Sequence, residues 1–551
     1  MEAPVTPSPP PIAATDHAAD CHAGAFDADP GCGHTTLADR LAELLADAAG
    51  EAAVLRDADT LMLFAHDVRR AGAPPLLVFR PADVAALQAG LAAIAATGVS
   101  LVPRGGGMSY TDGIICDRRD TIAVDLARLD RVTRIDTANL FVTVEAGCTW
   151  ARLDEALAPH GLRTPFWGPM SGRFATVGGA LAQGTASFGT AQVGTSGDNL
   201  LGLEVVLADG RLLVTGPAGQ PGTLPFLRQY GPDLAGLFAN DCGALGIKAR
   251  ITLPLQPRPG AVDHLSLLFA DFATMAAAMQ AIAREGLASE LFAMDPVVTR
   301  QFAGASIGFR QDLAMLLAIG RAEPGPLSAA LRMAQVARAG RRFIGREGFQ
   351  LHAIFEGRSA RAARERKAQA RALAAGSVEL PPTIPAALRA APFPPLPLLA
   401  PDGQRVLPIH GILPWSAAVA FDRALAALLK ATAGRCAAAR LTVAGSFFAI
   451  ARSALLYEPV FYWADAPTPY QAARSPGIEA RHPDNPQARA LVDELTTRII
   501  RLLRDHGATH LQIGRVYPFA EGRNEPALGL LRAIKRNLDP QGRMNPGVLG
   551  L

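Results

Sequence analysis

The stretch LVPRGGGMSYTDG, which runs from Leu101 to Gly113, decides the fold of this chain. It begins as a short apolar strand and breaks into three consecutive glycines, Gly105–Gly107. Glycine adopts positive φ and lets another group approach closely, and successive free N–H groups in such a turn form a concave site for an anion. Arg104 adds a fixed positive charge and Ser109 a hydroxyl donor. The stretch predicts a loop that holds a phosphate or pyrophosphate, although a tight surface turn with an incidental arginine explains the same residues equally well.

A second glycine-rich segment, from Phe166 to Gly202, favours a phosphate-binding loop over an incidental surface turn. A loop of this length in a compact domain is functional or disordered, and apolar residues such as Trp167 and Leu181 argue against disorder. The segment therefore predicts an ordered wall of small residues against a large flat ligand. No GxGxxG follows a strand, so a Rossmann site is not indicated. The sequence GTAQVGTS has P-loop glycine spacing but places Thr195 at the lysine position, which excludes a nucleoside triphosphatase.

Four blocks in this order resemble the FAD-binding domain of the vanillyl-alcohol oxidase and p-cresol methylhydroxylase superfamily. They are PRGGGMSYTDG, ATVGGALAQG, FGTAQVGTSGDNLLGLEVVLADGRLLVTG and YGPDLAGLFANDCGALGIKARITLPL, and a late RMNPGVLG supports them. The resemblance covers roughly Pro75 to Pro257. It implies that the first loop holds the FAD pyrophosphate, that the second segment lies along the ribityl chain and isoalloxazine, and that the GALGI turn meets the adenine side.

The same resemblance assigns individual residues to the cofactor. The expected FAD contacts are Pro103, Arg104, Gly105, Gly106, Gly107, Met108, Ser109, Thr176, Val177, Gly179, Ser196, Asp198, Asn199, Gly246, Ile247 and Asn545. Asn545, in the closing motif, would lie near the pyrimidine edge of the flavin or near the substrate. Covalent attachment of FAD occurs in this superfamily, and no residue pattern in this chain decides it.

The composition of the whole chain narrows the possible partners. It has 551 residues, 49% of them hydrophobic, and a net charge of +3, which is too mild to argue for nucleic acid. Its six cysteines form no CxxC pair, so we expect reduced thiols and a cytoplasmic protein. No uncharged apolar run reaches the roughly 18 residues of a membrane span. The resemblance implies a small-molecule substrate and an electron acceptor that is oxygen, a quinone or a cytochrome, and it leaves room for a homodimer.

We predict an α+β fold, a two-domain flavoprotein with an α+β cap over the FAD-binding domain. The expected parts are a disordered tail (1–34), a PCMH-type FAD-binding domain (35–260), a cap or substrate domain (261–515) and a C-terminal return to the FAD domain (516–551). Periodicity predicts strands at 75–79, 121–126, 141–145, 203–207, 211–215, 246–255, 264–269, 349–355 and 510–517, and helices from Thr36 and at 81–97, 149–160, 271–285, 358–375 and 528–538. The proline-rich stretch 381–401 predicts a surface excursion.

The tail contains Cys21-His22 and Cys32-Gly33-His34, but this spacing is not that of a standard zinc site, so no metal is predicted.

Three late segments hold the candidate catalytic residues. His410, between apolar residues in PIHGILPW, is either a satisfied core histidine or a base over the flavin. Arg452, in an otherwise apolar stretch, needs an anionic partner such as a substrate carboxylate or an internal acid. In HLQIGRVY, read as a strand, His510 shares one face with Gln512 and Gly514, whereas Arg515 and Tyr517 share the other.

Neither branch of the superfamily is fully reproduced at this last segment. The hydroxy-acid branch has Glu-His-Gly-x-Gly, of which His510 and a later glycine match; the phenol-oxidising branch has Tyr-Arg, whereas Tyr517 precedes Pro518. We expect oxidation of a hydroxy acid or related alcohol, with His510, His410 or Tyr517 as base, Arg452 or Arg515 as carboxylate partner, and hydride transfer to flavin N5. The alternatives are a phenolic alcohol oxidase or 4-cresol dehydrogenase-like enzyme, and a flavin electron-transfer protein without catalysis.

Overall fold

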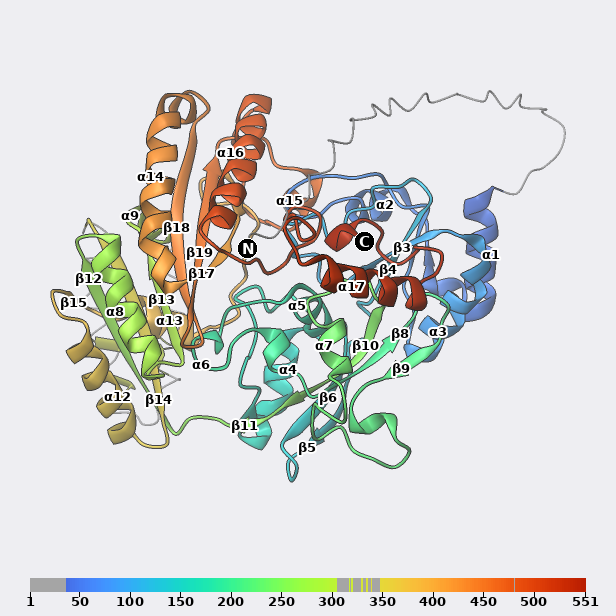
Figure 1. Cartoon of the computed structure of the whole chain (residues 1–551), viewed down its shortest axis with the longest axis horizontal. Coiled ribbons are helices and arrows are strands. Elements are labelled where there is room, and N and C mark those ends of the chain that lie inside the picture. The colour runs from blue at the N-terminus through green and yellow to red at the C-terminus, as the bar shows by residue number, and fades with distance from the viewer. Residues whose placement is uncertain are drawn as a thin grey trace, which may run out of the picture.

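The computed structural model describes residues 36–304, 347–479 and 481–551, together with positions 317, 319, 320, 329, 330, 333, 334 and 338. The tail predicted at 1–34, with its Cys-His pairs, lies outside these residues. Figure 1 shows the elements before residue 260 on one side and those between 261 and 505 on the other. The last helix, α17 (Glu525–Leu538), returns to the first group (Figure 1). The chain is therefore mixed α and β, as predicted.

The first helix, α1 (Leu37–Ala49), begins where the sequence places its cap. The Thr36 hydroxyl accepts a hydrogen bond from the Asp39 N–H at 3.1 Å, and the Asp39 carboxylate accepts one from the Thr36 N–H at 3.2 Å. Such a cap stabilises a helix by about 1 kcal/mol. Leu41 and Leu45 turn into the core, so the helix is fixed at its start and along one face.

The glycine loop leaves from a small, mostly parallel sheet. In spatial order its strands are β1 (Val54–Leu55), β2 (Leu77–Phe79), β4 (Thr121–Asp125) and β3 (Ser100–Arg104), accompanied by α2 (Ala58–Phe64) and α3 (Val84–Ala93). Strands β2, β4 and β3 are parallel. Because β3 ends at Arg104, the three glycines start at the carboxyl end of a parallel strand, where ligands of open α/β sheets bind.

A five-stranded antiparallel sheet carries the second glycine-rich segment. Its order is β5 (Val132–Asp136), β6 (Phe141–Glu145), β10 (Ile247–Pro254), β8 (Gly202–Val206) and β9 (Leu212–Val214). The accompanying elements are α4 (Trp150–Leu157), α5 (Val177–Gln183), α6 (Thr190–Val193), α7 (Leu234–Phe238) and the short pair β7 (Leu162–Arg163) and β11 (Gln256–Pro257). The predicted β8–β9 hairpin is confirmed, with Gly210 at φ +85° in its turn.

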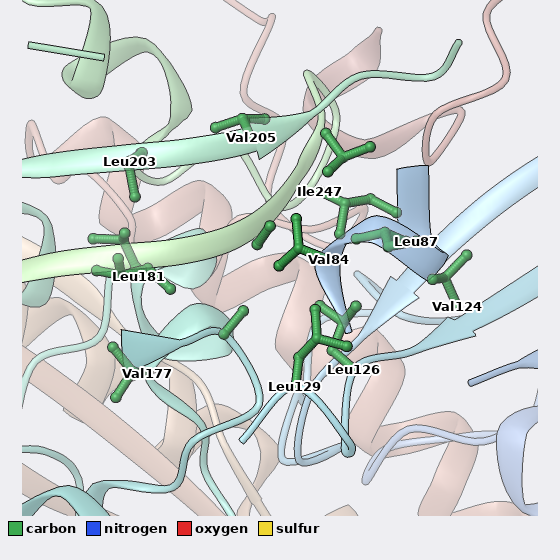
Figure 2. Close-up of a cluster of buried hydrophobic side chains, with 14 of the residues drawn as sticks. Val84, Leu87, Val124, Leu126, Leu129, Val177, Leu181, Leu203, Val205 and Ile247 are labelled. Carbon is green, nitrogen blue, oxygen red and sulfur yellow. The ribbon is translucent and has the colours of Figure 1, made fainter. Parts of the chain in front are cut away.

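One hydrophobic core joins these two sheets. Figure 2 shows Val84 and Leu87 of α3 close to Ile247 of β10, and Leu181 of α5 next to the same strand, with Val177 one helical turn before it. All five side chains are buried. Helix α5 is thereby anchored through its apolar face, which fixes the position of the glycine-rich segment around it.

The second group of elements is built on an eight-stranded antiparallel sheet. In order its strands are β15 (Val378–Leu380), β12 (Ala261–Phe269), β14 (Phe349–Gly357), β13 (Glu290–Met294), β18 (Leu441–Ile450), β19 (Ala454–Trp463) and β16 (Arg405–Pro408), with β17 (Gly411–Pro414) also paired to β19. Its helices are α8 (Phe272–Arg284), α9 (Pro296–Gly304), α12 (Ala360–Leu373), α13 (Thr383–Ala390), α14 (Trp415–Ala438), α15 (Pro469–Ala473) and α16 (Pro486–Asp505). The predicted strands and helices of this half are confirmed near 264–285 and 349–375. Among the described residues no helix is long and apolar enough to cross a membrane.

The predicted surface excursion at 381–401 is wrong. The stretch contains α13, and Phe393 lies edge-on to Trp167 with ring centroids 6.1 Å apart. Leu398 and Leu399 are buried. The prolines are compatible with this helix, because Pro385 lies in its first turn. The N–H groups there have no partner within a helix, so a residue without an N–H loses no hydrogen bond.

The predicted strand at 510–517 is also wrong. Thr509 pairs with Ile412, after which the backbone turns through Gln512 at φ +48° and Gly514 at φ +54°. A Cβ atom at position 514 would lie 2.7 Å from the hydroxyl of Thr111. The segment therefore curls over the loop that follows the first glycines, and an alternating pattern of faces does not apply to it.

The C-terminal residues extend the parallel sheet. The Leu101 N–H donates to the Arg543 carbonyl at 2.8 Å, and the Asn545 N–H donates to the Leu101 carbonyl at 2.7 Å. Strand β3 is the edge of its sheet, so this contact covers an otherwise unpaired edge. Lys535 of α17 fixes the turn, because its buried ammonium donates to the Met544 carbonyl at 2.7 Å.

Candidate active site

A cavity of about 310 Å³ lies where the two halves of the chain meet. One wall comes from the first glycine loop, helix α5 and the turn at 242–248; the other comes from Leu396 and from strands β18 and β19. We call these the flavin wall and the cap wall. The flavin wall consists of Pro103, Arg104, Gly105, Gly106, Gly107, Met108, Ser109, Thr176, Gly178, Gly179, Gly246, Ile247, Lys248 and their neighbours, and the cap wall of Leu396, Phe448, Leu456 and Glu458, with Tyr110 and Gln512 also on the cavity surface.

The first glycine loop has the donors that a pyrophosphate requires. Within the described residues, no hydrogen bond uses the backbone N–H groups of Gly105–Ser109, although they line the cavity. A Cβ atom at position 106 would lie 2.6 Å from the carbonyl carbon of Phe174, so only glycine fits there. Unused donors in a glycine turn form an anion site, and this wall therefore fits FAD by its pyrophosphate.

Arg104 supplies the charge beside this loop. It is buried, its Nη1 donates to the His66 carbonyl at 2.6 Å, and its guanidinium lies 4.9 Å from the ring centroid of Phe64 and 5.1 Å from that of Tyr470. The side chain is thus held in one position by a carbonyl and two rings. A positive charge so fixed favours a bound diphosphate without a change of conformation.

A buried glutamate of the cap half positions the second glycine-rich segment. The Glu290 carboxylate on β13 accepts hydrogen bonds from the Trp167 indole at 3.3 Å and from the Gly189 N–H at 2.7 Å. Trp167 in turn stacks on Phe188 with centroids 4.7 Å apart. Burial raises the pKa of Glu290 to about 7, against the effect of the Gly189 hydrogen bond. The segment is therefore fixed from the opposite half of the chain.

Most residues assigned to the cofactor line this cavity, but five do not. Val177 faces the hydrophobic core (Figure 2). Ser196 and Asn199 donate to the carbonyls of Ala180 and Val193, which keeps the segment folded on itself. Asp198 is exposed and accepts from the Thr195 N–H. These four residues shape the segment from behind, so direct contact with the cofactor was the wrong expectation for them.

Asn545 is the fifth residue outside the cavity wall. Its amide donates to the carbonyls of Gly113 and Cys242 at 2.8 and 2.7 Å, and its oxygen accepts from Arg515 at 3.1 Å. All the polar atoms of the side chain are occupied within the protein. Asn545 therefore connects the closing motif to the loop at Gly113 rather than facing the flavin or the substrate.

The three candidate bases lie together. The His410 Nε2–H donates to the Leu511 carbonyl at 2.9 Å, and the His510 Nδ1–H donates to the His410 carbonyl at 2.9 Å, because carbonyls only accept. The Tyr517 ring stacks on His510 with centroids 4.2 Å apart, and its oxygen accepts from the His410 N–H at 2.8 Å. Burial lowers the pKa of His410 to about 4 and lowers that of His510, so both imidazoles are neutral near pH 7.

This cluster is beside the cavity, not on its surface. None of the three residues belongs to the cavity wall. Burial raises the pKa of the Tyr517 hydroxyl, and the charge of Glu458 raises it further. His410 has the buried, hydrogen-bonded environment of a satisfied core histidine, and it does not line the cavity. Of the four imidazole nitrogens in this cluster, the Nε2 atom of His510 is the one without a hydrogen bond to a described residue.

The two candidate carboxylate partners are placed elsewhere. Arg452 lies exposed in the turn between β18 and β19, outside the cavity wall, where its carbonyl accepts from the Trp415 indole at 3.3 Å. Arg515 donates to the carbonyls of Asp112, Ile115 and Pro546 and pairs with Asp117 at 3.2 Å. Neither guanidinium faces the cavity, so the assignment of a substrate carboxylate to them was wrong.

The acidic residue of the cap wall was missed by the sequence analysis. Glu458 on β19 lines the cavity, and burial raises its pKa to about 7. No side-chain hydrogen bond or ion pair holds its carboxylate within the described residues. Tyr110 on the flavin side lies close enough for the charge of Glu458 to raise its pKa, which burial already raises. The sequence does carry a signal for it, because Glu458 is the single charged residue in the apolar run ALLYEPVFYW.

Comparisons with known proteins identify two parts of this chain. Residues 75–216 match the family model of an FAD binding domain, and residues 489–549 match that of the C-terminal domain of FAD linked oxidases. An FAD-linked oxidoreductase of Mycobacterium tuberculosis is 30% identical over 41% of this chain and 48% of its own length. D-lactate dehydrogenase [cytochrome] 1 of Saccharomyces cerevisiae is 30% identical over 34% of this chain and 31% of its own. The alignments thus span about half or less of these curated relatives.

Solved structures share the fold over most of the chain. p-Cresol methylhydroxylase with substrate bound has a TM-score of 0.69 at 16% identity, covering 93% of this chain and 96% of that one. The 4-ethylphenol oxidase of Gulosibacter chungangensis has a TM-score of 0.66 at 18% identity, with the same coverage. The chain therefore has an FAD-binding domain and a C-terminal FAD-linked oxidase domain, it shares the fold of p-cresol methylhydroxylase, and FAD is its cofactor.

Proposed function

We propose that this protein is an FAD-dependent oxidoreductase that oxidises the CH–OH group of a small substrate held between the flavin wall and the cap wall. The observation that carries the proposal is the opposition of the two walls. One offers unused backbone donors at Gly105–Ser109, and the other offers the unpaired carboxylate of Glu458. Names of relatives such as D-lactate dehydrogenase and a glycolate oxidase subunit support oxidation of a hydroxyl group.

Oxidation of an alcohol requires that a hydride and a proton leave the substrate. Bound FAD would supply the redox chemistry by accepting the hydride at N5. Glu458 takes the hydroxyl proton, because a carboxylate with a pKa near 7 is partly ionised at neutral pH and is basic enough to accept a proton. Tyr110 and Gln512, also on the cavity surface, orient the hydroxyl group. The apolar Phe448 and Leu456 exclude water from the reacting atoms.

The neighbouring His410–Tyr517–His510 cluster supports the wall rather than replacing Glu458. Its donors are committed to the carbonyls of Leu511 and His410, which hold the curled segment before Gln512. The alternative, with the free Nε2 of His510 as base, requires the cluster to open onto the cavity. We propose a cytoplasmic location for the enzyme, and oxygen, a quinone or a cytochrome as its electron acceptor.

The proposal is tested by the absorption spectrum of the purified protein under anaerobic conditions. Protein loaded with FAD should show the flavin band, and addition of alcohols and hydroxy acids should bleach it for at least one class. Acid precipitation separates free from covalently bound flavin. A protein that binds FAD, is reduced by dithionite and is bleached by no hydroxyl compound would be an electron-transfer flavoprotein, which would contradict the proposal.

A further inference from the structure

The positively and negatively charged side chains of the cavity lie on opposite walls. Among the described residues, the cationic side chains on its surface are Arg104 and Lys248, both on the flavin wall. Arg104 donates to the His66 carbonyl at 2.6 Å, and the ammonium of Lys248 lies 2.5 Å from the carboxylate of Asp241. These two cations are therefore already held by protein groups and lie beside the cofactor. No cation of the described chain faces the substrate side.

The cap wall presents the opposite character. Phe448, Leu456 and Leu396 are apolar, and Glu458, two residues after Leu456 on β19, is the ionisable group of that wall. Across the sheet, Glu458 is paired in register with Ser446 and not with a base. A substrate carboxylate placed here would meet a second carboxylate in an environment without counter-charge. Like charges so placed disfavour binding strongly.

Building on the proposed function, we infer that the substrate is an apolar alcohol without a carboxylate, either neutral or carrying an amine. Glu458 accepts a hydrogen bond from the hydroxyl of a neutral substrate, and it pairs with the ammonium of a cationic one. A hydroxy acid is rejected by the same residue. The specificity would thus differ from that suggested by relatives named for lactate and glycolate.

The groups around Glu458 give this discrimination a defined pH dependence. The titratable side chains that sense its charge are Tyr110 after the glycine loop, Tyr462 on the same strand and Tyr517 in the C-terminal segment. All three remain protonated, because burial and Glu458 raise their pKa values. His410, next to Tyr517, is neutral near pH 7. Glu458 is therefore the group whose protonation changes the charge of the cap wall as the pH falls through about 7.

The effect of substrate charge on binding is tested with compounds that share a carbon skeleton and differ in one terminal group. Styrene glycol, mandelate and phenylethanolamine differ at one terminal group, as do propylene glycol, lactate and isopropanolamine. Dissociation constants are measured from the perturbation of the flavin spectrum of the FAD-loaded protein, and reduction from anaerobic bleaching. We expect each hydroxy acid to bind on the order of 10²-fold more weakly than its glycol above pH 7. Lowering the pH should tighten hydroxy-acid binding, weaken amine binding and leave glycol binding unchanged.

Glu458→Gln should remove the difference between glycol and hydroxy acid in binding, whatever it does to turnover. Asp422→Asn is the matched control, since it neutralises another carboxylate of the same half of the chain whose pKa burial raises but which lies outside the cavity wall. That variant should keep the wild-type ratio of dissociation constants.

Two results would overturn the inference. The first is that hydroxy acids bind, or reduce the flavin, as strongly as the corresponding glycols. The second is that no glycol and no amine binds. Failure of the proposed function looks different: the expected order of binding would be seen without bleaching by any compound.

Discussion

The two walls of the cavity recognise their ligands by different means. The flavin wall uses the main chain, with unused N–H groups at Gly105–Ser109 and a glycine at position 106 that a larger residue cannot replace. The cap wall uses side chains, with Glu458 alone among apolar neighbours. Recognition by backbone depends on the path of the chain, whereas recognition by side chains changes with single substitutions. A shared cofactor and a divergent substrate can therefore coexist on one fold.

The largest effect is expected on the flavin wall. Gly106→Ala would place a Cβ atom 2.6 Å from the carbonyl carbon of Phe174, a backbone atom that cannot move aside alone. We expect loss of FAD from the purified protein and a loss of stability of about 3 kcal/mol or more. Flavin absorbance per protein and thermal unfolding measure both. Gly434→Ala, in the open on α14, is the control and should retain FAD. Full flavin content in Gly106→Ala would show that the two loops are not in contact.

The next largest effect is expected at Glu458 on the cap wall, where turnover should change and FAD binding should not. Glu458→Gln should lower turnover of a reactive alcohol by roughly 10² to 10⁴, the usual contribution of a general base, and leave FAD content unchanged. In the wild type, kcat/KM should rise about tenfold per pH unit below pH 7 and level off above, because the carboxylate accepts a proton only when ionised. That rise should be absent in the variant. Ser446→Ala, directly across the sheet, serves as the control. Unchanged turnover in Glu458→Gln would return the role of base to His510.

A smaller effect is expected at Arg515, which joins the curled C-terminal segment to the loop that follows the first glycines. Arg515→Ala leaves the carbonyls of Ile115 and Pro546 without their donor. We expect a loss of about 2 to 3 kcal/mol in unfolding free energy and unchanged substrate KM. Chemical denaturation and steady-state kinetics measure the two quantities. A large rise in KM with unaltered stability would instead identify Arg515 as a substrate ligand.

The smallest effect is expected at Arg452, outside both walls. Its side chain is exposed in the β18–β19 turn, so Arg452→Ala should change stability by less than about 0.5 kcal/mol and leave kcat/KM unchanged. Since Arg452 is one of the two arginines that the sequence analysis offered as a carboxylate partner, the same kinetics are measured with mandelate and styrene glycol. A selective loss with mandelate would move the substrate pocket toward that turn.

The contrast between the walls also explains what the sequence predicted. Helix α1 and the β8–β9 hairpin follow from local rules of capping and turn chemistry, so the cap at Thr36 and the turn at Gly210 are confirmed. Backbone freedom likewise drew attention to Gly105–Gly107, which line the cavity. The position of Glu458 depends on the pairing of eight strands, which local patterns do not encode. Arg452 looked buried because its neighbours are apolar, yet those neighbours form two strands and the arginine forms their turn.

The pairing of the C-terminal residues with Leu101 bears on the way the protein is made. The first glycine loop leaves the ribosome long before Arg543 and Asn545, which supply the hydrogen bonds that cover the edge of β3. Until synthesis reaches them, that edge is open and the loop lacks its support at Gly113. Cofactor loading is thus expected to follow translation rather than accompany it. A nascent chain interrupted before these residues would present a bare strand edge, a natural target for chaperones and proteases.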